Sequence, residues 1–203
     1  MIIKVCGMRE EENIRQVEQL GVDLLGFIFY PKSPRYVTSV PGYLSAKAKK
    51  VGVFVNESYD TIMKYTEKFS FDYIQLHGNE SPDFCYSLCR HNIHIIKAFS
   101  ISEQEDLKLT ESYNGICDYY LFDTKTGNYG GSGKRFDWNI LSHYQANSPF
   151  ILSGGISMDN MDILRSFTHP RLAGYDINSC FEIYPGMKDV SKINNFLQEL
   201  SIK

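Results

Sequence analysis

One segment of the chain combines a carboxylate, a cation and a cluster of glycines. Residues 121–138 read LFDTKTGNYGGSGKRFDW, in which an apolar run ends on Asp123 and four glycines follow from Gly127 to Gly133. Glycines at this density can hold a phosphate through backbone N–H groups, and a carboxylic acid in an apolar setting can donate a proton. The residues alone favour a third role for Asp123, in which it accepts hydrogen bonds from backbone N–H groups at a strand end.

A thiol near the N-terminus is the second group of chemical interest. Cys6 ends the apolar run IIKVC, and the alternation of a strand puts Lys4 on the same face. A thiol acts as a base in its thiolate form, and its ordinary pKa of roughly 8.5 leaves little thiolate at neutral pH unless a cation is near. Lys4 and Arg9 are the candidate cations. Most cysteines in such places are small buried hydrophobic residues, so the residues alone assign Cys6 no role.

Short apolar runs that alternate with helical patterns must position these groups. The predicted strands are residues 2–6, 24–29, 50–55, 73–76, 94–99, 119–122, 150–152 and 174–177, and the clearest helical patterns are residues 10–21, 58–69, 82–91, 157–167 and 189–200. Ser157 and Asp189 are predicted N-caps of the last two helices. Strands that alternate with helices pair in parallel through right-handed crossovers, and eight such units can close into a barrel.

The sequence therefore predicts an α/β protein built as a single (β/α)8 TIM barrel, with one catalytic domain over residues 1–203. An open doubly wound sheet is the competing fold. It would call for a G-x-G-x-x-G turn after the first strand, where this chain reads CGMRE (6–10). In a barrel, the residues that end the strands gather at the C-terminal mouth, where active sites are built. Cys6, His77, Asp123 and Asn178 are the mouth candidates. Lys97 and Asp176 also lie in apolar strands and need partners if buried.

Composition excludes several classes of partner. The 203 residues are 43% hydrophobic, with a formal net charge of −3, which indicates neither nucleic acid nor an anionic membrane as a partner. No apolar run approaches the roughly 20 residues that a membrane span requires. The first residues, MIIKVCGMREEENI, lack the apolar core of a signal peptide. The five scattered cysteines fit reduced thiols, so we expect a cytoplasmic protein.

Seven stretches together resemble one known family. They are KVCGMR (4–9), GVDLLGFIFYPKSPRYV (21–37), VGVFVN (51–56), IQLHGNE (74–80), FDTKTGNYGGSGKRFDW (122–138), LSGGIS (152–157) and PGMKD (185–189). In this order they resemble the phosphoribosylanthranilate isomerases of tryptophan biosynthesis. The resemblance implies a (β/α)8 barrel that converts N-(5-phosphoribosyl)anthranilate to 1-(2-carboxyphenylamino)-1-deoxyribulose 5-phosphate by an Amadori rearrangement, without a metal or an organic cofactor.

The resemblance also implies roles for individual residues. Asp123 is the expected general acid, which protonates the furanose ring oxygen, and its apolar strand favours the protonated form unless Lys125 points inward. Cys6 is the expected base, which removes the proton from C2 of the opened sugar. Arg35, in a proline-stiffened loop, is expected to bind the anthranilate carboxylate. His77 is expected to bind substrate near its aromatic ring.

The phosphate is expected after the seventh and eighth strands. Gly154 and Gly155 let backbone N–H groups approach an anion, and Asn178 and Ser179 follow the eighth strand. The family usually reads Asp-x-Ser-Ser-Gly-Val-Glu there, whereas this chain reads DINSCFE (176–182), so a side chain at Cys180 replaces a glycine. The glycine-rich residues 127–133 then become a loop that closes over substrate. Asp176 is a substrate-binding candidate, although a structural pair with Lys4 is favoured.

Two other functions and a metal site are the alternatives. An isomerase of the histidine-pathway aminoaldose usually has a carboxylate in place of Cys6, which argues against it. A non-catalytic barrel would lack one acid–base partner, and both are present. Cys85, Cys89, His91 and His94 fall within ten residues but lack zinc-site spacing, so no metal is expected. The expected partner is a phosphorylated small molecule, and the sequence leaves open whether the protein is a monomer or a homodimer.

Overall fold

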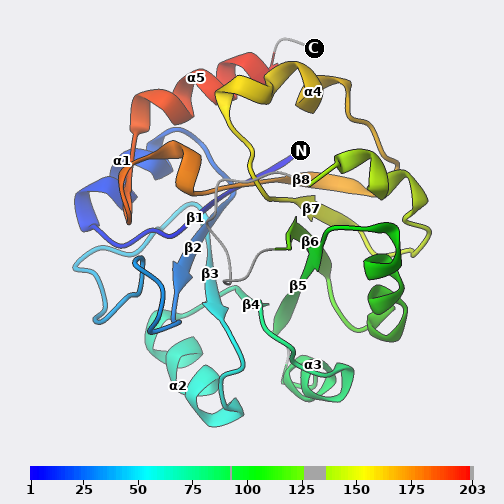
Figure 1. Cartoon of the computed structure of the whole chain (residues 1–203). Helices are drawn as coiled ribbons and strands as arrows, with labels where there is room; N and C mark the ends of the chain where they lie inside the picture. Colours follow the sequence, from blue (N-terminus) through cyan, green and yellow to red (C-terminus); the bar gives the residue numbers. More distant parts are fainter. Residues whose placement is uncertain (92, 126–135, 202–203) are drawn as a thin grey trace.

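Eight parallel strands close into one barrel in sequence order in a computed structural model of the chain (Figure 1). The structure describes residues 1–91, 93–125 and 136–201. The strands are β1 (Ile2–Cys6), β2 (Leu24–Ile28), β3 (Lys49–Phe54), β4 (Tyr73–Leu76), β5 (His94–Ile101), β6 (Tyr119–Thr124), β7 (Phe150–Leu152) and β8 (Leu172–Ile177). The predicted fold is confirmed, and each strand lies within two residues of its predicted ends.

Helices surround the ring of strands (Figure 1). The described residues contain five α-helices, at the five predicted positions: α1 (Glu11–Gln19), α2 (Tyr59–Phe69), α3 (Pro82–Cys89), α4 (Met161–Ser166) and α5 (Val190–Ser201). The predicted caps are present: Asp189 Oδ1 accepts a hydrogen bond from Lys192 N at 3.0 Å, and Ser157 N-caps the short 3-10 helix η3 (Met158–Asn160) that leads into α4. Helix termini leave backbone N–H groups without partners, which such side chains satisfy.

Three connections lack an α-helix in the described residues. Strands β5 and β6 are joined by the 3-10 helix η1 (Gln104–Tyr113), and η2 (Trp138–His143) is a second 3-10 helix before β7. Residues 29–48, between β2 and β3, form turns without a helix, and this stretch contains Pro31, Pro34 and Pro41. The loop is docked on α1, because Glu18 accepts hydrogen bonds from the Tyr43 hydroxyl and from Lys47 N. Burial acts to raise the pKa of Glu18, but these hydrogen bonds and that of Ser45 outweigh it and lower the pKa to about 2.

The alternation along each strand separates two packed regions. One face points outward and packs under the helices with large apolar side chains such as Phe27, Phe54 and Phe122. The other face fills the barrel interior with smaller ones, among them Val51, Ala98 and Leu121, and Cys6 belongs to this inner set. The inner face therefore brings Lys4 and Cys6 into the barrel, where apolar neighbours isolate them from water.

A hairpin between β8 and α5 was not predicted. The 3-10 helix η4 (Ser179–Phe181) leads into β9 (Glu182–Tyr184), which pairs antiparallel with β10 (Met187–Lys188). Pro185 and Gly186 connect the two strands, and Gly186 has a φ of 89°, which suits glycine in the second central position of such a turn. The pairing sets Glu182 opposite Lys188.

Two further properties concern the helices and the cysteines. None of the helices in the described ranges has both the length and the apolar composition that crossing a bilayer requires. All five cysteines carry free thiols.

Candidate functional site at the barrel mouth

Lys4 and Asp176 form a buried ion pair inside the barrel. Strands β1 and β8 are neighbours with Lys4 in register with Asp176, and Lys4 Nζ lies 2.8 Å from Asp176 Oδ1. The Ser153 hydroxyl donates a further hydrogen bond to the carboxylate at 3.2 Å. The predicted pairing is confirmed, and it follows from closure, which makes the first and last strands adjacent.

Cys6 lies one inward position further along β1, nearer the mouth. A Cβ placed on Gly26 would lie 2.9 Å from Cys6 Sγ and 3.3 Å from Lys4 Nζ, so the glycine gives the thiol and the ammonium room to sit together. Burial raises the pKa of the Cys6 thiol, and the charges of Lys4 and Lys188 act in the opposite direction. Arg9, the other cation expected near Cys6, donates to Glu10 at 2.9 Å instead.

Asp123 sits at the mouth end of β6 and is 8% exposed. One carboxylate oxygen accepts a hydrogen bond from Thr124 N at 2.8 Å, which is the strand-end interaction expected from the residues alone. The other oxygen lies 3.4 Å from His77 Nε2, so it faces another mouth residue. Lys125 turns away to pair with Asp106 at 2.8 Å. One carboxylate oxygen of Asp123 is therefore bound by the backbone, and the other faces the barrel mouth.

The His77 ring lies between the Asp123 carboxylate and the Gln75 side chain of the barrel interior. Its Nδ1 lies 2.8 Å from Gln75 Nε2, and its Nε2 is the atom that faces Asp123. Gln75 is buried on the inner face of β4. The ring is thus held between an amide and a carboxylate, which fixes its orientation at the mouth.

Arg35 is bound by a carboxylate of the protein itself. Its Nε lies 2.9 and 3.0 Å from the two carboxylate oxygens of Glu182, and its Nη2 lies 2.6 Å from Oε2. Lys188 Nζ lies 2.6 Å from Glu182 Oε1 and donates to Asn178 Oδ1 at 2.7 Å. The four side chains form a continuous cluster, in which those of Arg35, Glu182 and Lys188 are buried, and we call it the Arg35 cluster. It links the β2–β3 loop to the hairpin.

The predicted phosphate residues lie on neighbouring strand ends. Gly154 and Gly155 follow β7 with φ of 80° and 70°, and a Cβ on Gly154 would lie 2.7 Å from Thr124 N. Ser179 begins η4 after β8, while the Asn178 side chain is engaged by Lys188. These backbones remain the predicted site of phosphate binding.

The replacement at Cys180 carries no backbone strain. Cys180 lies within η4 and is not among the residues with a positive φ. The backbone at this position therefore does not require a glycine in this chain. The glycine-rich segment 127–133, expected to close over substrate, lies outside the described residues.

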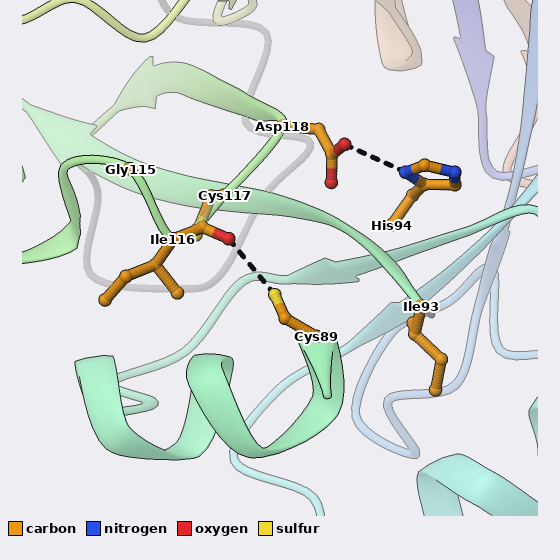
Figure 2. A pocket seen from close by; sticks show the side chains of 7 residues that line it. All are labelled: Cys89, Ile93, His94, Gly115, Ile116, Cys117 and Asp118. Atoms are coloured by element: carbon orange, nitrogen blue, oxygen red, sulfur yellow. Dashed lines mark hydrogen bonds and ion pairs between the residues drawn. The ribbon is translucent and has the colours of Figure 1, made fainter. Parts of the chain in front are cut away.

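A hollow at the opposite end of the barrel is unrelated to this site (Figure 2). It has a volume of about 490 Å³ and lies where β5 and β6 begin, lined by Cys89, His94 and Asp118 among others. Figure 2 shows Cys89 Sγ directed at Ile116 O, 3.1 Å away, and His94 Nδ1 at Asp118 Oδ1, 2.8 Å away. The described residues contain no group of three or more His, Cys, Asp or Glu side chains that could hold a metal ion.

Sequence reasoning missed the two residues that complete the Arg35 cluster. Glu182 and Lys188 were visible only as parts of family-like stretches, without a role. The turn signal was present, because Pro185 and Gly186 stand between them. Reading that pair as a two-residue turn would have predicted the hairpin, but it would have set Lys188 opposite Ile183. Only the register shift between Met187 and Lys188 sets the cation opposite Glu182.

Comparisons with known proteins agree with one another. The family model described as N-(5'phosphoribosyl)anthranilate (PRA) isomerase matches residues 3–199. The N-(5'-phosphoribosyl)anthranilate isomerase of Parabacteroides distasonis is 50% identical over 98% of this chain and 93% of its own length. A solved phosphoribosyl anthranilate isomerase in complex with reduced 1-(o-carboxyphenylamino)-1-deoxyribulose 5-phosphate covers 99% of this chain and 99% of its own, with a TM-score of 0.82 and 28% identity. A structure of monomers generated from the dimeric Thermotoga maritima enzyme covers 99% of each chain, with a TM-score of 0.80 and 28% identity.

Proposed function

The chain belongs to the N-(5'-phosphoribosyl)anthranilate isomerase family and is an isomerase of tryptophan biosynthesis, and we propose that its barrel mouth performs the reaction with Cys6 as base and Asp123 as acid. The observation that carries the assignment is their placement. Both side chains are buried on the inner face at the C-terminal ends of their strands, the end at which barrel enzymes react.

The reaction opens the sugar and then moves a proton. Asp123 donates a proton to the furanose ring oxygen, the bond from C1 to that oxygen breaks, and the anthranilate nitrogen forms a Schiff base with C1. The Cys6 thiolate then removes the proton from C2, which gives an enolamine that tautomerises to the ketone product. Lys4 stabilises the thiolate from the adjacent inward position, and Asp176 holds Lys4 in place. His77 orients the carboxyl oxygen of Asp123 that it faces.

The two ends of the substrate require anion sites. Arg35 binds the anthranilate carboxylate, and the backbones of Gly154, Gly155 and Ser179 bind the phosphate. The small residues after β7 and the turn after β8 support this phosphate site, since exposed N–H groups at strand ends suit an anion. The solved relative in complex with a reduced deoxyribulose 5-phosphate compound supports a phosphorylated substrate for this chain.

The same proposal covers the domain organisation, the location and the partners of the protein. Residues 1–203 act as one catalytic domain, because all eight barrel strands belong to one closed sheet. The protein works in the cytoplasm as a monomer or a homodimer, in keeping with the Thermotoga maritima relative, a dimeric enzyme from which monomers were generated. No nucleic-acid partner is proposed, in keeping with the net charge of −3.

Turnover of the substrate tests the proposal directly. N-(5-phosphoribosyl)anthranilate is made in situ, and the loss of its fluorescence is followed after the protein is added. We expect turnover that depends on protein concentration and persists in the presence of a metal chelator. A wild-type protein that is folded but leaves the fluorescence unchanged would contradict the proposed function.

A further inference from the structure

Arg35 has two edges on its guanidinium group, and the protein occupies one of them. The side-on edge, formed by Nε and Nη2, is bonded to Glu182. Within the described residues, Nη1 makes no hydrogen bond, so the end-on edge formed by Nη1 and Nη2 keeps donor capacity. A guanidinium can bind one carboxylate on each edge, because its five N–H groups are fixed in one plane.

The charges of the Arg35 cluster leave room for one more anion. Glu182 is shared between two cations, since Lys188 Nζ lies 2.6 Å from the same carboxylate. Arg35 and Lys188 contribute two formal positive charges and Glu182 one formal negative charge, so the formal net charge of the cluster is +1. All three side chains are nearly or fully buried, at 9%, 0% and 4% exposure respectively. An unbalanced buried cation attracts an anion strongly.

The Arg35 cluster packs against the backbone that directly follows Cys6. Gly7 follows Cys6 with a φ of 81°, and a Cβ there would lie 2.7 Å from Arg35 Cδ and 2.8 Å from Asn178 Oδ1. The stem of Arg35 therefore crosses the backbone directly after the proposed base. Glu182 is itself held from a third side, because Gly186 N donates to its Oε1 at 3.0 Å.

We infer that Glu182 is a positioning residue, which holds the side-on edge of Arg35 so that the end-on edge receives the substrate carboxylate. The inference rests on the proposed role of Arg35. The substrate carboxylate therefore binds beside Glu182 and does not have to displace it from Arg35. Lys188 has the supporting role of balancing Glu182, so that the pair does not cancel the charge of Arg35.

Replacing Glu182 by Gln distinguishes a positioning role of Glu182 from an effect of its charge, because the two predict opposite changes in KM. E182Q adds one positive charge to the cluster, so electrostatics alone would tighten the binding of the substrate carboxylate and lower KM. Loss of positioning would weaken it. We expect KM to rise about tenfold, the scale of losing a charge-assisted hydrogen bond, with a smaller change in kcat. A KM at or below the wild-type value overturns the inference.

A charge-matched double variant covers the case in which E182Q folds poorly. E182Q/K188M removes the buried cation whose counter-charge E182Q has removed, and it restores the formal net charge of +1. If only the charge mattered, this variant would keep the wild-type KM, whereas the positioning role predicts the same rise as in E182Q. E11Q is the control: Glu11 pairs with Arg15 at 2.9 Å on an exposed helix face, and its loss should leave KM unchanged.

Binding of anthranilate separates failure of this inference from failure of the proposed function. Its affinity is measured by calorimetry for the wild type, R35M, E182Q and R35M/E182Q. We expect R35M and the double variant to bind equally weakly, because Glu182 acts through Arg35. If R35M binds as the wild type does, the proposed role of Arg35 fails. If R35M is weakened while E182Q is not, Arg35 stands and the role of Glu182 is wrong.

Discussion

Two buried ionic clusters of the barrel differ in how completely protein acceptors occupy the hydrogen-bond donors of their cations. On the outer side of β5, Lys97 Nζ bonds Glu80 at 3.0 Å and also donates toward the backbone oxygens of Leu76, Gly78 and Ala98. At the mouth, the end-on edge of Arg35 has no such set of acceptors in the described residues. A buried cation surrounded by protein acceptors has a structural role, whereas one with donors to spare is ready for a ligand.

The largest expected effect is on the stability of the outer cluster. Lys97→Met leaves the carboxylate of Glu80 buried, and we expect the free energy of unfolding to fall by about 3–5 kcal/mol. Urea denaturation at pH 7 measures the loss, and the KM of the folded fraction should stay at its wild-type value. Lys125→Met, which breaks an ion pair whose lysine is half exposed, is the control and should cost about 0–1 kcal/mol. Equal losses in the two variants would remove the distinction between the clusters.

The next effect concerns chemistry at the mouth. Cys6→Ser and Asp123→Asn should each lower kcat about 10²-fold or more, the usual scale of general acid–base catalysis. Both replacements are close in size to the original residue, so thermal unfolding should change little. Near wild-type kcat in both variants would refute the proposed acid and base even if the activity itself were present.

A pH profile tests the surroundings of Cys6. The charged groups that act on this thiol are Lys4, Asp176 and Lys188, while burial raises its pKa. The base is the thiolate, so kcat/KM should fall about tenfold per pH unit below the thiol pKa and rise toward alkaline pH. Since Lys188 lowers that pKa, E182Q/K188M should shift the rising limb to higher pH, relative to E182Q alone. An unshifted limb would mean that Lys188 acts on Arg35 and Glu182 alone.

The smallest effect is expected at Cys180. Because η4 does not require a positive φ there, Cys180→Gly should change KM by no more than about twofold, since it relieves no backbone strain. Steady-state kinetics in the same assay measures it. A KM lowered about tenfold would show that the side chain of Cys180, and not the backbone, obstructs the phosphate.

The sequence predicted what periodicity and closure determine. The barrel strands and the α-helices of the described residues follow from apolar patterns along the chain, and the pairing of Lys4 with Asp176 follows from the adjacency of β1 and β8. Lys97 was recognised as a polar residue in an apolar strand, but its partner was not. Its neighbours Ile96 and Ala98 point into the barrel, so Lys97 points outward, against the rings of Phe99 and Tyr113.

The Arg35 cluster could not be predicted for a physical reason. Arg35 and Glu182 are 147 positions apart, and they meet through a loop without a helix and a hairpin with strands of three and two residues. Segments this short carry no measurable periodicity, and loop conformation depends on the packing that surrounds it. The resemblance to a family supplied a role for Arg35, but it could not supply the contact that orients it.

The ion pair between Lys4 and Asp176 joins the part of the barrel that is synthesised first to the part that is synthesised last. Lys4 and Asp176 lie 172 positions apart, and the Arg35 cluster likewise joins an early loop to a late hairpin. While residues 176–188 are still inside the exit tunnel, the cations of the first strand and loop have no counter-charge. A product truncated before residue 176 therefore lacks the counter-charge of Lys4 and most of the strand that closes the ring.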